Sequence, residues 1–131
     1  MSRLARTLSI RTDRQIAALD ITAEVSQALP STYSGLATVY VEHTTAAVTI
    51  NEAETRLLAD IETALSGLVE DEGWQHDAID DNAAAHLRAL IIGPSTVVPV
   101  KEGQLQLGRW QSVLFLECDG PRTRTVQLYT A

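Results

Sequence analysis

The spacing of the apolar residues changes twice along this chain, and these changes limit the fold more than any other feature. Before residue 51 apolar and polar residues alternate, as in "GLATVYVEH", which is typical of half-buried β-strands. From residue 51 the apolar residues recur every three or four positions, as on one face of a helix. From residue 95 the strand-like patterns return. This order predicts an α+β fold in which antiparallel sheets carry helices packed on one side.

The individual strands and helices follow from the same patterns. Strands are expected in "TLSIRTDRQIAALDIT" (one or two), "GLATVYVEH", "AAVTI", "STVVPV", "QLQLGRWQSVLFLEC" and "TRTVQLYT", with turns at "KEGQ" and "DGPR". A short helix is expected in "TAEVSQALP", and longer helices are expected after Asn51 and in "DDNAAAHLRALIIG".

The two longer helices carry recognisable start signals. Asn51 is a suitable N-cap for the first, and Glu52 and Glu54 in its first turn would favour the positive end of the helix dipole. The second would be capped by one of residues 80–82 and would end at Gly93. The first is expected to bury Leu57, Leu58, Ile61, Ala64, Leu65 and Leu68, and the second Ala83, Leu87 and Leu90.

Composition bounds the partners of this chain. Its 131 residues predict a single domain, 1–131, with a core large enough to need no disulfide. The net charge of −7 argues against nucleic acid, because phosphate backbones require a basic face. No apolar run reaches the length of a membrane span or a secretion signal, so we expect a cytoplasmic protein without a membrane partner. The single cysteine, Cys118, is expected to be buried and unreactive.

Three histidines are the best candidates for chemistry. His43 follows a strand in "EHTTAAVTINE", His76 lies in the acidic stretch "EDEGWQHDAIDD", and His86 lies in the second long helix. At 100° per residue His86 is about 60° from Ala83, at the edge of the buried face, where it can reach a cleft. The wide spacing lacks the close ligand pairs of zinc motifs, so three separately hydrogen-bonded histidines are an alternative to one metal site. The acidic stretch is either a solvated loop or a collar that attracts cations.

Polar residues near these histidines are candidates for binding an anion. Thr44 and Thr45 either bind an anion or satisfy a bulge in the strand. Asn51, beyond its capping role, would present a helix N-terminus of the kind that holds phosphate. In "ECDGPRTR" we prefer Arg122 as a phosphate partner, because its planar guanidinium matches phosphate oxygens.

Four segments follow one another along the chain: "HTTAAVTINE", "WQHD", "DNAAAHLRALIIGPS" and "PVKEGQLQLGRWQSVLFLECDGPRTR". In this order and spacing they resemble the YjbQ family, which is often labelled secondary thiamine-phosphate synthase. The resemblance covers nearly the whole chain and is strongest from about Gly35 to Arg124. It implies an antiparallel β-sandwich with two to three helices, assembled as a homotrimer. The chain departs from the family pattern at Arg109 in "LGRWQ", where threonine is common, and at "EAETR" after Asn51.

The resemblance also implies one site in which the histidines hold a divalent metal ion. The ligands in this sequence would be His43, His76 and His86. Zinc or a similar ion suits neutral imidazoles, whereas magnesium, which prefers oxygen ligands, would serve synthase chemistry. Catalytic roles would fall to Asn51, Glu52, Glu117 and Arg122, and cofactor-binding roles to Thr44, Thr45 and Asn82.

Three functions are therefore open. The family label implies an enzyme that joins a pyrimidine diphosphate to a thiazole phosphate and releases pyrophosphate; the metal and Arg122 would neutralise the departing diphosphate. The second is a metal-dependent hydrolase of a small phosphorylated metabolite, with Glu52 or Glu117 as general base. The third is a non-catalytic trimer that binds a metal or a small anion.

Overall fold

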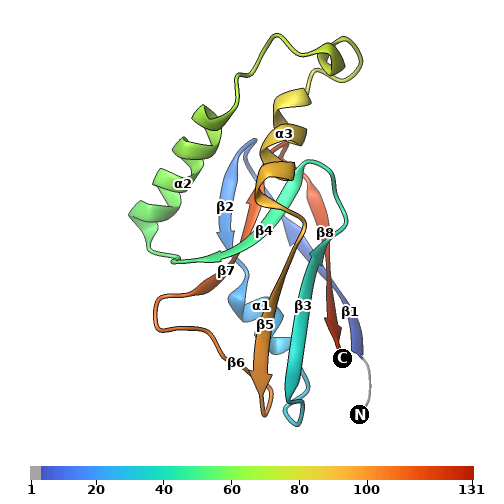
Figure 1. Ribbon diagram of the computed structural model, residues 1–131, viewed down its shortest axis with the longest axis vertical. Helices are drawn as coiled ribbons and strands as arrows, with labels where there is room; N and C mark the ends of the chain where they lie inside the picture. The colour runs from blue at the N-terminus through green and yellow to red at the C-terminus, as the bar shows by residue number, and fades with distance from the viewer. Residues whose placement is uncertain (1–3) are drawn as a thin grey trace.

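The computed structural model describes residues 4–131, so the first three residues of the predicted domain lie outside the described range (Figure 1). The strands are β1 (Leu4–Arg11), β2 (Ala17–Asp20), β3 (Gly35–Val41), β4 (Ala46–Asn51), β5 (Ser95–Lys101), β6 (Gln104–Leu105), β7 (Ser112–Glu117) and β8 (Thr123–Thr130). The helices are α1 (Thr22–Gln27), α2 (Thr55–Leu68), the 3₁₀ helix η1 (Gln75–Ala78) and α3 (Ala83–Ile92). The predicted α+β class is confirmed.

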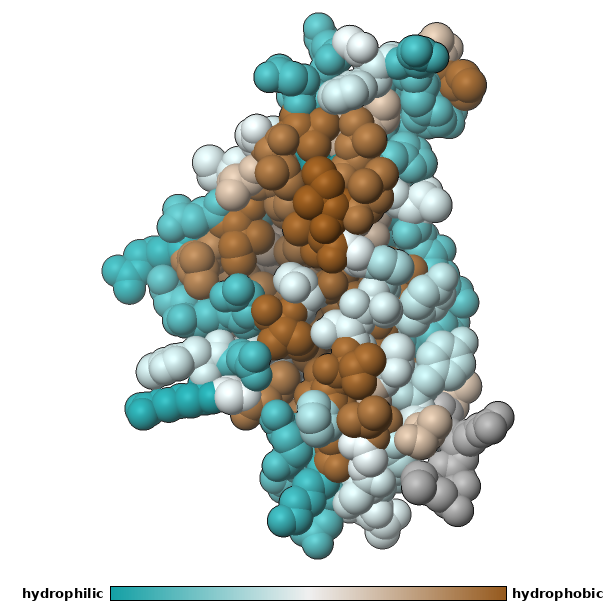
Figure 2. Space-filling view, viewed as in Figure 1, coloured by the Kyte–Doolittle hydropathy of each residue, from teal (hydrophilic) through white to brown (hydrophobic). Residues whose placement is uncertain are grey.

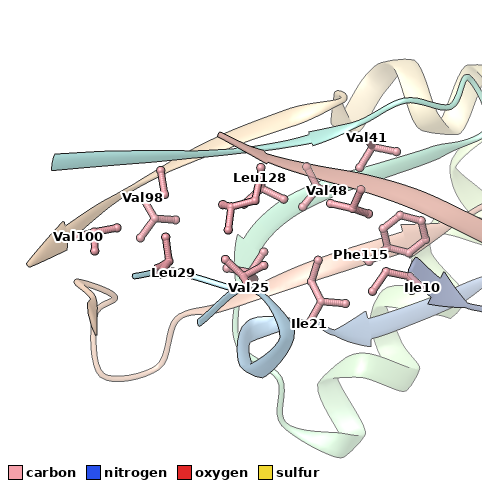
Figure 3. Packing of buried hydrophobic residues seen from close by; sticks show 14 of the residues in the cluster. Ile10, Ile21, Val25, Leu29, Val41, Val48, Val98, Val100, Phe115 and Leu128 are labelled. Carbon is pink, nitrogen blue, oxygen red and sulfur yellow. The ribbon is translucent and has the colours of Figure 1, made fainter. Parts of the chain in front are cut away.

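Two antiparallel sheets face each other across the main core. One has the order β1-β8-β3-β5-β6 and the other the order β2-β7-β4. The alternating pattern puts Ala37, Val39 and Val41 on one side of β3, and this side faces the core, where the three residues are 0–1% exposed. Figure 3 shows Val41 and Leu128 on one side of this core, with Phe115 of β7 on the other. β-Branched and aromatic residues such as Val41 and Phe115 suit the pleated surface of a sheet.

The central strand of the smaller sheet, β7, is buried on both faces. Val113 and Phe115 point into the main core, whereas Leu114 and Leu116 point outward into a second apolar cluster. That cluster is covered by the helices: α2 contacts β2, and α3 contacts β4 (Figure 1). The two longer helices thus lie on one side of the sandwich, as expected. No helix within residues 4–131 is long and apolar enough to cross a membrane.

The predicted N-cap of α2 is wrong. Asn51 is the last residue of β4, where the ladder to β7 holds it extended, and its side chain accepts a hydrogen bond from the Glu52 N–H (2.8 Å). Glu54 is the N-cap instead, because its carboxylate accepts from the Arg56 N–H (2.6 Å). Strand pairing therefore overrides the capping preference of Asn51, and neither predicted glutamate lies within the first turn.

The buried face of α3 also differs from the prediction. Leu90 is 67% exposed, although the helical pattern placed it in the core. The buried residues of this helix are Ala83, Ala84, Ala85, Arg88 and Ala89. Small side chains let the helix lie close to the sheet, which leaves Leu87 and Leu90 to line cavities on the other side. His86 keeps its predicted position at the edge of the buried face.

Candidate functional site

Three cavities meet at His86. A polar cavity of about 370 Å³ is lined by His43, Asn82, His86 and Arg122, among others. A larger one of about 740 Å³ shares His43 and His86 but is otherwise mostly apolar, with Tyr40 and Leu90 in its wall. A third, of about 480 Å³, contains His76 and His86. Each of the three histidines that the sequence singled out therefore lines at least one of these neighbouring cavities, which we together call the cleft.

The 3₁₀ helix η1 brings His76 to the start of α3. Asp77 of η1 accepts a hydrogen bond from the Ala83 N–H (3.1 Å) and so caps α3, the role predicted for residues 80–82. Asn82 occupies the N-cap position, but its side chain makes no capping bond. One turn into α3, the His86 ring meets the His76 ring edge to face, with centroids 4.9 Å apart. The predicted convergence of these two rings depends on this short connection.

His43 is held by the backbone of β8. Its Nε2 accepts a hydrogen bond from the Thr125 N–H (2.8 Å). Burial, and next the positive charge of Arg124, lower the pKa of His43 below its ordinary value of 6.5. The imidazole is therefore neutral at pH 7, and the lone pair of Nε2 is already in use.

The turn after β7 supplies the charged side of the cleft. Arg122 donates through Nε to the Asp119 carbonyl (2.7 Å) and through Nη2 to its carboxylate (2.8 Å), which also accepts from Asn82 (3.0 Å). The Nη1 of Arg122 forms no hydrogen bond within residues 4–131. Arg122 is thus oriented by its neighbours and keeps donors that an anion could accept, so its role as a phosphate partner stays a prediction.

Glu117, predicted as a general base, lies in the interior. Its side chain is 0% exposed and forms an ion pair with Arg124, which is itself buried. Burial opposes ionisation of Glu117, but hydrogen bonds from Arg124 and Thr12 outweigh it and lower the pKa of the carboxyl. Arg124 also donates to the Thr45 hydroxyl (2.9 Å). Glu117 and Thr45 therefore build the support beneath the cleft, and their polar atoms are taken up by that support.

Asn51 and Glu52 are not brought to the cleft by the fold of one chain. They lie at the far end of β4, whereas His43 lies just before that strand begins. At about 3.3 Å per residue, the strand separates its two ends by roughly 16 Å. Thr44, in contrast, is exposed and lines both cavities that contain His43. Of the predicted polar residues, Thr44, Asn82 and Arg122 line the cleft, and so does Thr45, whose hydroxyl is already bound by Arg124.

The donor atoms at the cleft fit a metal ion in part. The Nε2 of His76 is buried and has no hydrogen-bond partner, and Asp80 lies 3.7 Å away, beyond hydrogen-bonding distance. His76, its neighbour His86 and Asp80 offer the imidazole and carboxylate ligands that zinc accepts. His43 is less ready to join them, because its Nε2 accepts from the Thr125 N–H and only Nδ1 is left to bind an ion. Within residues 4–131 no three such side chains are gathered closely enough to be a ready metal site.

Two charged residues of this region were missed by the sequence reasoning. Arg124 lies on the same face of β8 as Val126 and Leu128, because the three are two residues apart along the strand. A cation on this inward face needs a carboxylate beside it, and this was a signal in the sequence. Asp119, which orients both Asn82 and Arg122, had no comparable signal, because turn carboxylates are common at surfaces.

Comparison with known proteins identifies the relatives of this chain. Residues 6–131 match the family described as UPF0047 protein YjbQ-like. The chain belongs to the YjbQ family. A UPF0047 protein of Methanothermobacter thermautotrophicus is 45% identical, over 100% of this chain and 94% of that protein. The UPF0047 protein YugU of Bacillus subtilis is 41% identical, over 93% and 95%.

Solved structures of YjbQ-like proteins have the same fold. A hypothetical protein of Aeropyrum pernix superposes with a TM-score of 0.92 and is 46% identical, over 98% of both chains. A protein of Sulfolobus solfataricus, described as YbjQ-like and of unknown function, gives a TM-score of 0.90 at 36% identity, over 98% of this chain and 96% of that chain. The antiparallel sheets and helices that frame the cleft are therefore shared with solved structures of YjbQ-like proteins.

Proposed function

We propose that the cleft is the active site of an enzyme that acts on a small phosphorylated metabolite. The observation that carries this proposal is the polar cavity in which two imidazoles and the available donors of Arg122 line one space. The adjoining apolar cavity, about twice as large, suits a flat heterocyclic ring. A phosphate group at Arg122 and a ring beside Leu90 would use both parts of the cleft.

The specific reaction that we propose is formation of thiamine phosphate. The bond between the pyrimidine methylene carbon and the diphosphate oxygen breaks, and the diphosphate leaves with the electron pair. A bond from the thiazole nitrogen to that carbon forms, so the products are thiamine phosphate and pyrophosphate. Donors aimed at the departing oxygens would stabilise the charge that develops there. Arg122 and His43 are the residues that we assign to this task.

A divalent metal ion is part of the proposal. His76 and His86, with Asp80 beside them, are the residues that would hold it. A bound ion would neutralise charge on the phosphate oxygens as a Lewis acid. Zinc or a similar ion suits this donor set better than magnesium, which prefers oxygen ligands. Metal analysis of purified protein by mass spectrometry, with His76→Ala as the comparison, tests this part.

We also propose that copies of this chain assemble as a homotrimer. Figure 2 shows apolar side chains gathered over α3 and again lower on the same face. Leu36, Leu90, Ile91 and Val97 are 53%, 67%, 54% and 52% exposed, respectively. Exposed apolar surface of this kind is typical of a contact between copies. Light scattering should then measure a particle of three times the chain mass of 14.2 kDa. Val97→Glu should lower this particle mass, because it places a charge in the contact.

The experiment for the reaction is an assay of thiamine phosphate from the two purified substrates. We expect product with the wild type, and a loss of about 100-fold or more in kcat/KM for Arg122→Met, as for a removed charge-stabilising donor. Arg109→Met is the matched control, because Arg109 stacks on Trp110 (4.9 Å) and lines none of the three cavities.

The other two functions give different results in the same assay. Hydrolysis of simple phosphate esters without thiamine phosphate formation would favour the metal-dependent hydrolase. Binding of phosphorylated ligands without turnover of any of them would favour the non-catalytic protein. If Arg122→Met and Arg109→Met have the same kcat/KM, the cleft is not the site of phosphate recognition and the proposal fails.

A further inference from the structure

The hydrogen bond between Thr125 and His43 fixes which ring nitrogen carries the proton. A backbone N–H can only donate, so the Nε2 of His43, 2.8 Å away, must present its lone pair. Rotating the ring by 180° about χ2 would place the Cε1 carbon against this N–H, and the Thr125 N–H would then have no acceptor. The neutral ring therefore carries its single proton on Nδ1.

The backbone that imposes this tautomer is itself firmly held. The ladder between β3 and β8 ends at Val41, opposite Val126, so the Thr125 N–H lies just beyond the last strand pair. His43, two residues past the end of β3, takes up that free donor. On the other side of Thr125, Arg124 is anchored in the interior by its ion pair with Glu117. The Thr125 N–H thus has no freedom to turn away from the ring.

The opposite nitrogen of His43, Nδ1, has no hydrogen-bond partner among residues 4–131. The half-buried ring lines the same polar cavity as Arg122. A neutral Nδ1–H on a half-buried ring can donate a hydrogen bond and cannot accept one. It is also a poor acid, because giving up its proton would create an imidazolate.

We propose that His43 acts as a fixed neutral hydrogen-bond donor, through Nδ1–H, to an oxygen of an anionic substrate, and is neither a metal ligand nor a proton-transfer group. This inference rests on the proposed function and assigns His43 its task within that function. Metal ligation through Nδ1 would move the proton to Nε2, where it would meet the Thr125 N–H head on, donor against donor. The arrangement resembles catalytic sites in which a neutral imidazole polarises a substrate oxygen.

Two isosteric variants test the tautomer directly. In His43→Asn the side-chain NH₂ lies near the position of Nδ1, so the donor to the substrate is kept and the acceptor for Thr125 is lost. In His43→Gln the side-chain oxygen lies near the position of Nε2, so the acceptor is kept and the donor is lost. We expect pyrophosphate, measured by titration calorimetry, to bind His43→Asn roughly 10- to 100-fold tighter than His43→Gln, the effect of one hydrogen bond to a charged group.

A purely structural role for His43 predicts the opposite order, because only His43→Gln keeps the bond to Thr125. Equal affinity of the two variants, or tighter binding by His43→Gln, would therefore overturn the inference. If either of these results is found while pyrophosphate still binds the wild type and Arg122→Met still weakens that binding, the inference about His43 fails and the proposed function stands. Absence of pyrophosphate binding by the wild type, or no effect of Arg122→Met, removes both.

Nitrogen-15 NMR of the histidine rings gives a second, independent readout. We expect His43 to show a protonated Nδ1 and an unprotonated Nε2 in the folded protein at pH 7. Addition of zinc chloride alone should shift the ring nitrogens of His76 or His86 and leave those of His43 unchanged. A zinc-dependent shift at His43, or a proton on its Nε2, would overturn the inference.

Discussion

The buried ion pair between Glu117 and Arg124 makes the clearest prediction about stability. The carboxylate accepts hydrogen bonds from the Arg124 Nε (2.9 Å) and Nη2, the Thr12 hydroxyl (2.7 Å) and the Asp119 N–H (3.0 Å). Both side chains are almost completely removed from water, at 0% and 2% exposed. Replacing Arg124 by methionine keeps much of its volume but leaves the Glu117 carboxylate buried without its cation.

Removing one partner of a buried pair costs about 3–5 kcal/mol, a large part of the roughly 5–15 kcal/mol by which a domain of this size is stable. With a urea m-value of about 2 kcal/mol/M, a loss of about 4 kcal/mol lowers the midpoint of unfolding by about 2 M. Circular dichroism in urea at one fixed protein concentration measures this shift. The matched control is Arg56→Met, because the Arg56 side chain is 90% exposed and its surface pair is worth about 0–1 kcal/mol.

The double variant Glu117→Leu/Arg124→Met separates loss of the pair from loss of packing. Removing both charges leaves no uncompensated ion, so the double variant should be at least about 2 kcal/mol more stable than the two single changes predict by addition. The reasoning would be refuted if Arg124→Met cost less than about 1 kcal/mol, or if the two single changes simply added.

Four further outcomes follow from other contacts. Arg88→Met should lower the free energy of unfolding by about 2–4 kcal/mol, because three carbonyls at the end of α2 lose their donor, and lysine at this position should not restore it. Burial raises the pKa of the Cys118 thiol to about 11, so iodoacetamide should label it at pH 8 only after unfolding in urea. Because the pKa of His43 is lower in the folded protein than its ordinary value of 6.5, the unfolded chain takes up a proton first, and the free energy of unfolding should fall as the pH drops below 6.5. His43→Asn should have a flatter dependence on pH over that range. Gly103→Ala should destabilise the protein more than Gly93→Ala by about 1–3 kcal/mol in thermal melts, because both residues have positive φ but only at Gly103 would the new Cβ lie 2.6 Å from backbone.

The cleft illustrates where local patterns stop being informative. The sequence placed His86 at the edge of a helix, because the 3.6-residue period alone gives its angle from the buried face. The same period put Leu90 in the core, yet the helix turns its alanines to the sheet and exposes Leu90. A helix rich in apolar residues has more than one face that can be buried, and only its packing partner decides between them.

The sequence by itself determined most of the strands and the three α-helices, but not the 3₁₀ helix η1; it also determined that Cys118 is buried and that His43 and His86 lie at element edges. Periodicity carries this information, because it reports which side of an element avoids water. Only the tertiary structure decided that Asn51 continues a strand, that Glu117 pairs with Arg124, and that Thr125 sets the tautomer of His43. Those contacts join segments more than five residues apart through strand register and turn geometry, and no local preference specifies which distant group an exposed donor or acceptor will meet.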